Sequence, residues 1–206
     1  MDYILQLDHS IILFVHNHFY NVYMAYVMYA LSYLTGPIGI WTVLGFLLLI
    51  PKKYRCMGAT MILSSAIVLF VGDIVLKHLV ARLRPFVDFP MIQSYLPLPK
   101  ATSYSFPSGH SFQSFSAATA IYRGLGNIKP NKQYLGKIAF AVAILVAFAR
   151  VYLFVHFPTD VLCGAIFGII NGIISWNIVQ FIWNYWHGIR RSKVVTYEPY
   201  KLKDRK

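Results

Sequence analysis

Three short segments of the chain carry cations, histidines and a carboxylate at spacings that suit the binding and transfer of a phosphate group. They run over residues 77–85, 107–110 and 150–160. Each lies at the end of a strongly apolar stretch, where a permanent charge beside hydrocarbon is costly and is usually retained for function. Together, the segments predict a membrane enzyme that acts on a phosphate group.

The first segment holds two cations that could bind phosphate oxygens. Lys77 and Arg84 would lie nearly two turns apart on one face of a helix. We expect Pro85 to end that helix, so that Arg84 is its last residue and lies at the entrance to the site. Arginine offers a planar fork for two oxygens, and lysine offers a mobile point charge. Arg82 is expected to point elsewhere, and snorkelling of these long cations to the lipid headgroups is the alternative interpretation.

The second segment, Pro107-Ser108-Gly109-His110, predicts the start of a helix. The free N–H groups at a helix start, together with the helix dipole, bind anions. Gly109 has no Cβ, so an anion could approach the backbone there. His110 would lie beside that anion and could donate a proton to a leaving oxygen. A turn with Ser108 as a capping residue explains the same tetrapeptide without function.

The third segment joins a buried charge to a histidine and a carboxylate. Arg150 interrupts an apolar run, and His156 and Asp160 follow it. Pro158 is expected to begin the last helix, so that Asp160 lies in its first turn and accepts a hydrogen bond from His156. Such a carboxylate fixes the imidazole tautomer and leaves the other ring nitrogen free as a nucleophile. A purely structural His–Asp pair at a helix start is the alternative.

Composition indicates a membrane protein. Apolar residues make up 57% of the 206 residues and charged residues 13%, and a spanning helix needs about 20 mostly apolar residues. The net charge of +12 does not indicate nucleic acid, because the basic residues fall between apolar runs instead of on one soluble face. Neither cysteine belongs to a metal-type cluster, and no disulfide is expected.

The apolar runs predict an all-α, polytopic membrane helix bundle in a single domain, 1–206. Residues 3–20 mix apolar and polar side chains and predict an amphipathic helix that lies in the membrane interface, with a sixth crossing as the alternative. Gly36-Pro37 is expected to kink or break the first span. Glycines at every fourth position from Gly164 to Gly172 predict a flat stripe for close helix packing. We therefore expect an interfacial helix over residues 1–20, a helix bundle over 21–186 and a basic cytoplasmic tail over 187–206. The expected spans of the bundle are 21–50, 54–84, 108–125, 138–154 and 159–186.

The basic residues also predict how the bundle is oriented. Of the 19 Lys and Arg residues, 14 lie at 51–55, at 123–137 and after residue 189, which is one side of a five-span bundle. The positive-inside rule places that side in the cytoplasm. The three phosphate-binding segments are therefore expected at the outer face.

The three segments resemble the signature of the type 2 phosphatidic acid phosphatase family, whose site is shared with vanadate-dependent haloperoxidases. The family pattern reads Lys, six residues, Arg-Pro; then Pro-Ser-Gly-His; then Ser-Arg, five residues, His, three residues and Asp. The chain follows it from Lys77 to Asp160, except that Ala149 stands where the family usually has serine. That departure affects one hydroxyl contact and leaves the nucleophile in place.

The resemblance implies a role for each residue. His156 would attack phosphorus and form a phosphohistidine, and Asp160 would orient it. His110 would protonate the leaving group and then help water to hydrolyse the intermediate. No metal or other cofactor is implied. The phosphate oxygens would be held by Lys77, Arg84, Ser108, Gly109 and Arg150.

The resemblance also implies a lipid substrate. Small bacterial members include undecaprenyl-diphosphate phosphatases, so we expect hydrolysis of undecaprenyl diphosphate at the outer face of a multi-pass cell-membrane protein. Phosphatidylglycerophosphate, phosphatidate and lipid A are alternative substrates, and an anion transporter or channel is the non-enzymatic alternative. The expected partners are membrane lipids and an isoprenyl or glycerophospholipid phosphate, with no nucleic acid and no assigned oligomeric state.

Overall fold

The computed structural model describes residues 2–36, 39–93 and 103–195, so Pro37, Lys100 and residues 196–206 of the expected tail lie outside the described residues. Within those ranges the chain is helical and has no strand, which confirms the expected all-α class. The helices are α1 (Asp2–Phe19), α2 (Val22–Leu34), α3 (Ile40–Leu49), α4 (Arg55–Ile67), a π-helical segment (Val68–Leu76), α5 (Lys77–Val80), α6 (Pro85–Asp88), α7 (Pro90–Gln93), α8 (Gly109–Ile128), α9 (Tyr134–Tyr152) and α10 (Pro158–Val195), with 3-10 turns at Lys52–Tyr54 and Pro130–Lys132.

Several helical stretches have the length and apolarity of membrane spans. Among the described residues, three stretches qualify: Lys52–Asp88, Pro130–Tyr152 and Pro158–Trp186. α2 and α3 are shorter apolar helices, because the helix expected over 21–50 ends at Leu34 and a new one begins at Ile40. The expected break near Gly36 is therefore confirmed, whereas the count of five spans stays a prediction.

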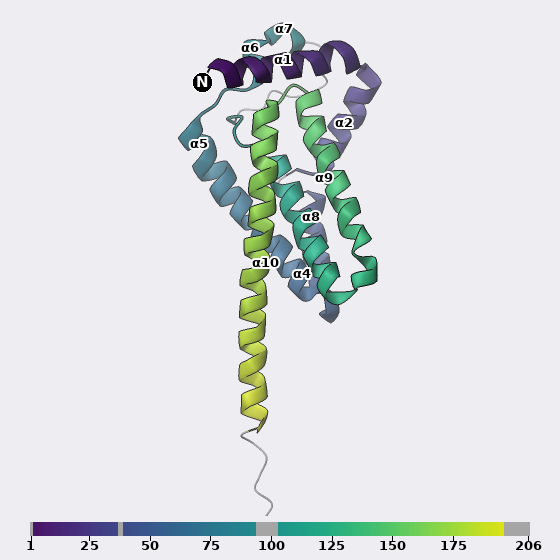
Figure 1. Cartoon of the computed structure of the whole chain (residues 1–206), viewed down its shortest axis with the longest axis vertical. Helices are drawn as coiled ribbons and strands as arrows, with labels where there is room; N and C mark the ends of the chain where they lie inside the picture. The colour runs from purple at the N-terminus through teal and green to yellow at the C-terminus, as the bar shows by residue number, and fades with distance from the viewer. Residues whose placement is uncertain (1, 37–38, 94–102, 196–206) are drawn as a thin grey trace, which may run out of the picture.

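α8 lies in the centre of the bundle and packs against α4, α9 and α10 (Figure 1). Its small side chains are buried along most of its length, as in helices that pack against other helices rather than lipid. α10 approaches it closely: a Cβ on Gly168 would lie 2.6 Å from the carbonyl oxygen of Phe112. A Cβ on Gly172 would lie 2.6 Å from Thr119 Cβ, and one on Gly164 would lie 2.7 Å from the carbonyl oxygen of Ser108, the N-cap of α8. The expected glycine stripe is confirmed.

The helix that carries Lys77 ends earlier than the sequence predicts. α5 stops at Val80, where Ala81 takes left-handed backbone angles with φ 48°. Arg84 is extended, with φ −89° and ψ 155°, because the residue before a proline is driven out of the α region. Pro85 then begins α6 instead of ending a helix. The expectation that Lys77 and Arg84 share one helical face is therefore wrong.

α1 lies across the end of the bundle where α9 ends and α10 begins (Figure 1). Asp8 and Ile12 are buried on its inner side, and Ile12 packs against Val151 and Phe154. The helix expected over 3–20 is therefore present, and its place in the membrane interface stays a prediction. Large apolar side chains are exposed along its outer side: Ile4, Leu7, Ile11 and Phe14.

Candidate active site

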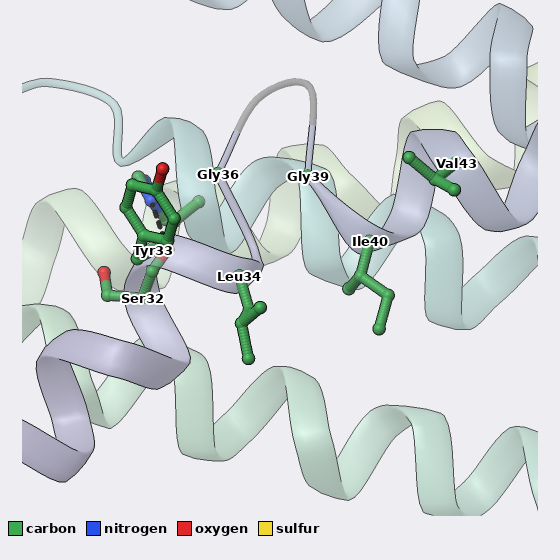
Figure 2. Close-up of a pocket in the computed structure, with 8 residues that line it drawn as sticks. Ser32, Tyr33, Leu34, Gly36, Gly39, Ile40 and Val43 are labelled. Carbon is green, nitrogen blue, oxygen red and sulfur yellow. Dashed lines mark hydrogen bonds between the residues drawn. The ribbon is translucent and has the colours of Figure 1, made fainter.

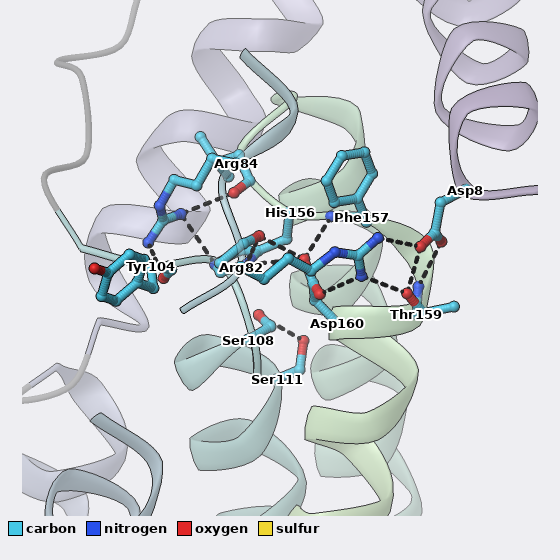
Figure 3. Close-up of polar contacts among 12 residues, drawn as sticks. Asp8, Arg82, Arg84, Tyr104, Ser108, Ser111, His156, Phe157, Thr159 and Asp160 are labelled. Carbon is cyan, nitrogen blue, oxygen red and sulfur yellow. Dashed lines mark hydrogen bonds and ion pairs between the residues drawn. The ribbon is translucent and has the colours of Figure 1, made fainter. Parts of the chain in front are cut away.

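The three sequence segments meet at the end of the bundle that α1 covers (Figure 3). Two hydrogen bonds between backbone atoms connect these segments. Ser108 N donates to Asp160 O at 3.1 Å, and Ser105 N donates to Arg82 O at 2.8 Å. The start of α8, the start of α10 and the α5–α6 connection are thus held against one another.

His156 lies in the loop between α9 and α10 with 2% of its surface exposed. The direct hydrogen bond expected to Asp160 is not formed, because Nδ1 lies 3.8 Å from Asp160 Oδ2, beyond hydrogen-bond distance. The Ser105 hydroxyl lies between them, 3.3 Å from Nδ1 and 2.5 Å from Oδ2. A serine that the sequence analysis missed therefore links the pair.

This arrangement fixes the tautomer of His156. The Ser105 hydroxyl has one proton, which it donates to the Asp160 carboxylate, so it accepts a hydrogen bond from Nδ1–H. Nε2 is then the bare nitrogen, and it lies 3.3 Å from Arg84 Nη1, a group that only donates. Burial lowers the pKa of His156 well below its ordinary value, and the nearby Arg84 and Arg150 guanidinium groups lower it further. A neutral imidazole with its lone pair toward an arginine suits attack on phosphorus.

Asp160 is fully buried, and donors on three sides hold it. Its Oδ2 accepts from the Ser105 hydroxyl and from Phe157 N at 2.9 Å, and its Oδ1 accepts from Arg82 Nη1 at 2.7 Å. The expectation that Arg82 points away from the site is wrong. Because the chain leaves the helix at Ala81, Arg82 turns toward the start of α10 (Figure 3).

Carbonyl oxygens on both sides hold the Arg84 guanidinium in place. Its Nε donates to Ser103 O at 2.6 Å, Nη1 to Val155 O at 2.8 Å and Nη2 to Tyr104 O at 3.2 Å. Arg84 is buried, so this charge is fixed before a ligand arrives. Preorganised charges of this kind stabilise the charge that develops in a phosphoryl-transfer transition state.

Arg150 supplies a second buried guanidinium from the last turn of α9. One terminal nitrogen donates to Ser32 Oγ on α2. Its Nε is buried and has no hydrogen-bond partner among the residues that the structure describes. A buried donor without an acceptor is costly. A phosphate oxygen of a bound substrate could accept the hydrogen bond that Arg150 Nε does not make to any described residue.

Lys77 and the first turn of α8 face one carboxylate. Lys77 Nζ forms an ion pair with Asp73, and a Cβ on Gly109 would lie 3.4 Å from Asp73 Oδ1. A carboxylate oxygen thus lies close to the backbone at Gly109, and the approach of a phosphate oxygen at this position stays a prediction. Ser108 occupies the N-cap position, yet its side chain makes no capping hydrogen bond and accepts one from Ser111 Oγ at 3.2 Å. The capping alternative is not supported.

His110 lies in the first turn of α8 beside an open cavity. Its Nε2 is 3.1 Å from Ser32 O, and because a carbonyl oxygen only accepts, Nε2 carries a proton in this contact. The cavity lies between α2 and α3 and measures about 680 Å³ (Figure 2). Besides His110, it is lined mostly by apolar residues and glycines: Ser32, Tyr33, Leu34, Gly36, Gly39, Ile40 and Val43.

Ala149, which replaces the family serine, is fully buried and packs in a cluster with Ala25, Met28 and Tyr152. Over residues 2–36, 39–93 and 103–195, the structure forms no group of three or more His, Cys, Asp or Glu side chains suited to a metal ion.

The Ser105 linkage makes a mutational prediction. Ser105→Ala is expected to lower kcat by about 10- to 100-fold, because Nδ1–H of His156 loses its acceptor and Asp160 Oδ2 loses one of its two donors. Ser64→Ala is the matched control, since Ser64 is also buried but donates to Met61 O within its own helix. Turnover of both purified variants at equal thermal stability checks this, and equal losses would show that the hydroxyl does not act through His156.

Comparisons with known proteins agree with this geometry. The model of the PAP2 superfamily matches residues 53–184. The chain is 35% identical over 129 residues to an undecaprenyl-diphosphatase of Sulfolobus acidocaldarius, which covers 63% of this chain and 58% of that protein. It is 37% identical over 100 residues to phosphatidylglycerophosphatase B of Bacillus subtilis, which covers 47% and 45%. The chain thus spans about half the length of the curated relatives it matches.

A solved structure shares the fold. The crystal structure of a transmembrane PAP2-type phosphatidylglycerolphosphate phosphatase from Bacillus subtilis aligns with a TM-score of 0.70 at 26% identity, over 88% of this chain and 89% of that one. The family match extends over more than half of the chain and contains all three segments of the site. On sequence and structure, this membrane protein belongs to the PAP2 superfamily.

Proposed function

We propose that the chain is a lipid phosphatase in which Nε2 of His156 receives the phosphoryl group. The observation that carries this proposal is the buried imidazole whose Nδ1–H is held by Ser105 and whose bare Nε2 faces Arg84. A nitrogen nucleophile beside a fixed guanidinium suits in-line attack on a phosphate group.

The reaction has two half-reactions. First, Nε2 of His156 bonds to phosphorus while the bond from phosphorus to the leaving oxygen breaks, and protonated His110 gives its proton to that oxygen. Neutral His110 then takes a proton from water, which attacks phosphorus, and the P–N bond breaks to release phosphate. The phosphate oxygens lie against Arg84, Arg150, Lys77 and the first turn of α8, with Ser108 and Gly109. These fixed charges supply the positive field, so we propose that no metal is needed.

The proposed substrate is undecaprenyl diphosphate, cleaved to undecaprenyl phosphate and phosphate. The cavity between α2 and α3 supports a lipid, because it brings apolar side chains up to His110, where the leaving oxygen would lie. The relative from Sulfolobus acidocaldarius is named for this activity. Phosphatidylglycerophosphate is the second candidate, and the 0.70 TM-score to the Bacillus subtilis phosphatase favours it.

We propose that the site faces the outside of the cell membrane. The basic turn Lys52–Tyr54 and the basic connection between α8 and α9 lie at the end of the bundle away from α1 and the site (Figure 1). Basic loops mark the cytoplasmic side. In this arrangement α1 lies in the outer interface, with its exposed apolar side chains toward lipid.

The test is phosphate release by the purified protein from each lipid in turn. Because fixed cations replace a metal, excess EDTA is expected to change the rate by less than about twofold. Vanadate is expected to inhibit, since its trigonal bipyramid resembles the transferring phosphoryl group, whereas sulfate at the same concentration serves as the control. A higher kcat/KM on undecaprenyl diphosphate than on phosphatidylglycerophosphate supports the named substrate.

Two results would count against the proposal. A strict Mg²⁺ requirement that is not an effect on substrate dispersion contradicts the metal-free mechanism. Phosphate flux through liposomes without hydrolysis of either lipid indicates an anion channel instead.

A further inference from the structure

We propose that Asp8 of α1 is a positioning residue of the active site, which holds the carboxylate of Asp160 in place through Arg82 and Thr159. This inference rests on the proposed function, because Asp160 matters here as the group that orients His156. Asp8 lies more than 60 residues before the first of the three motif segments in the sequence. No spacing in the sequence indicates the connection.

Asp8 is fully buried, and three donors surround it (Figure 3). Its Oδ2 accepts from Arg82 Nη2 at 2.7 Å and from Thr159 Oγ1 at 2.5 Å, and its Oδ1 accepts from Thr159 N at 2.9 Å. The last contact satisfies a free N–H in the first turn of α10, which helix starts leave without an internal partner. One helix thus caps the start of another, one residue before the candidate catalytic carboxylate.

Arg82 carries this contact to Asp160. While Nη2 bonds to Asp8, Nη1 bonds to Asp160 Oδ1 at 2.7 Å and to Thr159 Oγ1 at 2.8 Å. The guanidinium also lies over the Phe157 ring, with Cζ 4.2 Å from the centroid. One guanidinium therefore joins two buried carboxylates, and its planar fork fixes their separation. The Thr159 hydroxyl donates its proton to Asp8 and accepts a hydrogen bond from Arg82. Each of these donors therefore points to an acceptor.

A purely structural role would require only that Asp8 hold α1 against the bundle. The chain offers a second ionic contact of α1, between His9 and Asp88, in which neither side chain is hydrogen-bonded to Arg82, Thr159 or Asp160 in the structure. His9 Nε2 lies 3.1 Å from Asp88 Oδ2, and this pair is partly exposed. Comparing Asp8 with Asp88 separates the placement of α1 from the orientation of Asp160.

The experiment measures kcat and KM of Asp8→Asn and Asp88→Asn with the lipid that the wild-type protein hydrolyses. Asparagine keeps an oxygen for Thr159 N but presents an uncharged side chain to Arg82. Asp8→Asn is expected to lower kcat by about 10- to 100-fold with KM within about twofold, as for groups that orient a catalytic side chain from one bond away. Asp88→Asn is expected to keep kcat within about twofold of wild type.

A double variant tests whether Asp8 acts through Arg82. If it does, Asp8→Asn in the Arg82→Gln background is expected to lower kcat no further, whereas independent effects would multiply. If Asp8→Asn does not fold, Thr159→Val replaces it, because valine keeps the shape and removes only the hydroxyl between Asp8 and Arg82. It is expected to lower kcat by about tenfold.

The outcomes separate this inference from the proposed function. An active wild-type protein whose Asp8→Asn variant keeps wild-type kcat, changes KM alone or shows multiplicative losses with Arg82→Gln overturns the role of Asp8 and leaves the phosphatase intact. A wild-type protein that releases no phosphate from any lipid overturns both.

Discussion

His156→Ala is expected to abolish turnover, with a loss of more than about 10⁴-fold, because no other described group can accept the phosphoryl at that position. Nε2 of His156 is the ring nitrogen that faces Arg84, and alanine has no nitrogen to place there. The matched control is His18→Ala, since His18 is exposed on α1 and its Nδ1 lies 2.9 Å from Phe14 O of the same helix. Its turnover is expected to match that of the wild type.

His110→Ala is expected to lose activity in a way that depends on the leaving group. A lipid diphosphate expels a phosphate monoester, which leaves more readily than the alkoxide of phosphatidate and needs its proton less. His110→Ala should therefore lose less activity on undecaprenyl diphosphate than on phosphatidate, while His156→Ala loses both alike. The same fractional loss on both lipids would show that His110 does not protonate the leaving oxygen.

Arg84→Lys and Arg150→Lys are each expected to lower kcat/KM by well over about tenfold, although the charge is kept. A lysine at position 84 cannot donate at once to Ser103 O, Val155 O and the His156 ring. The matched control is Arg123→Lys at the other end of α8, where the guanidinium bonds to Asn177 Oδ1. Rates for all three purified variants check this, and equal effects would show that only the net charge matters.

Much of the site could be predicted from sequence because its residues lie where helices end. The Pro-Ser-Gly-His segment begins α8, Pro158 begins α10 and Arg150 lies in the last turn of α9. Helix ends of this kind follow from local rules for proline and apolar periodicity. Charges beside such ends have few explanations other than function.

The sequence-based expectations that proved wrong concern residues outside regular helices. The helix stops at Val80 through a left-handed Ala81, a choice that alanine does not signal, and Arg82 consequently turns to Asp160 instead of away. Arg82→Ala is therefore expected to lower turnover strongly, although helical spacing predicts that Arg82 points away from the site. Ser105 lies in irregular chain where no periodicity places its hydroxyl between His156 and Asp160. Contacts of this kind depend on the tertiary fold.

Trapping the phosphoenzyme tests the central claim most directly. Wild-type protein is mixed with lipid diphosphate labelled in its terminal phosphate, quenched in alkali during turnover, digested and analysed for labelled peptides. We expect an acid-labile, alkali-stable phosphate on the peptide that contains His156. This label should be absent from His156→Ala and more abundant in a variant slowed in hydrolysis, such as His110→Ala. Label on the peptide that contains His110, or full turnover with no labelled histidine, would contradict this expectation.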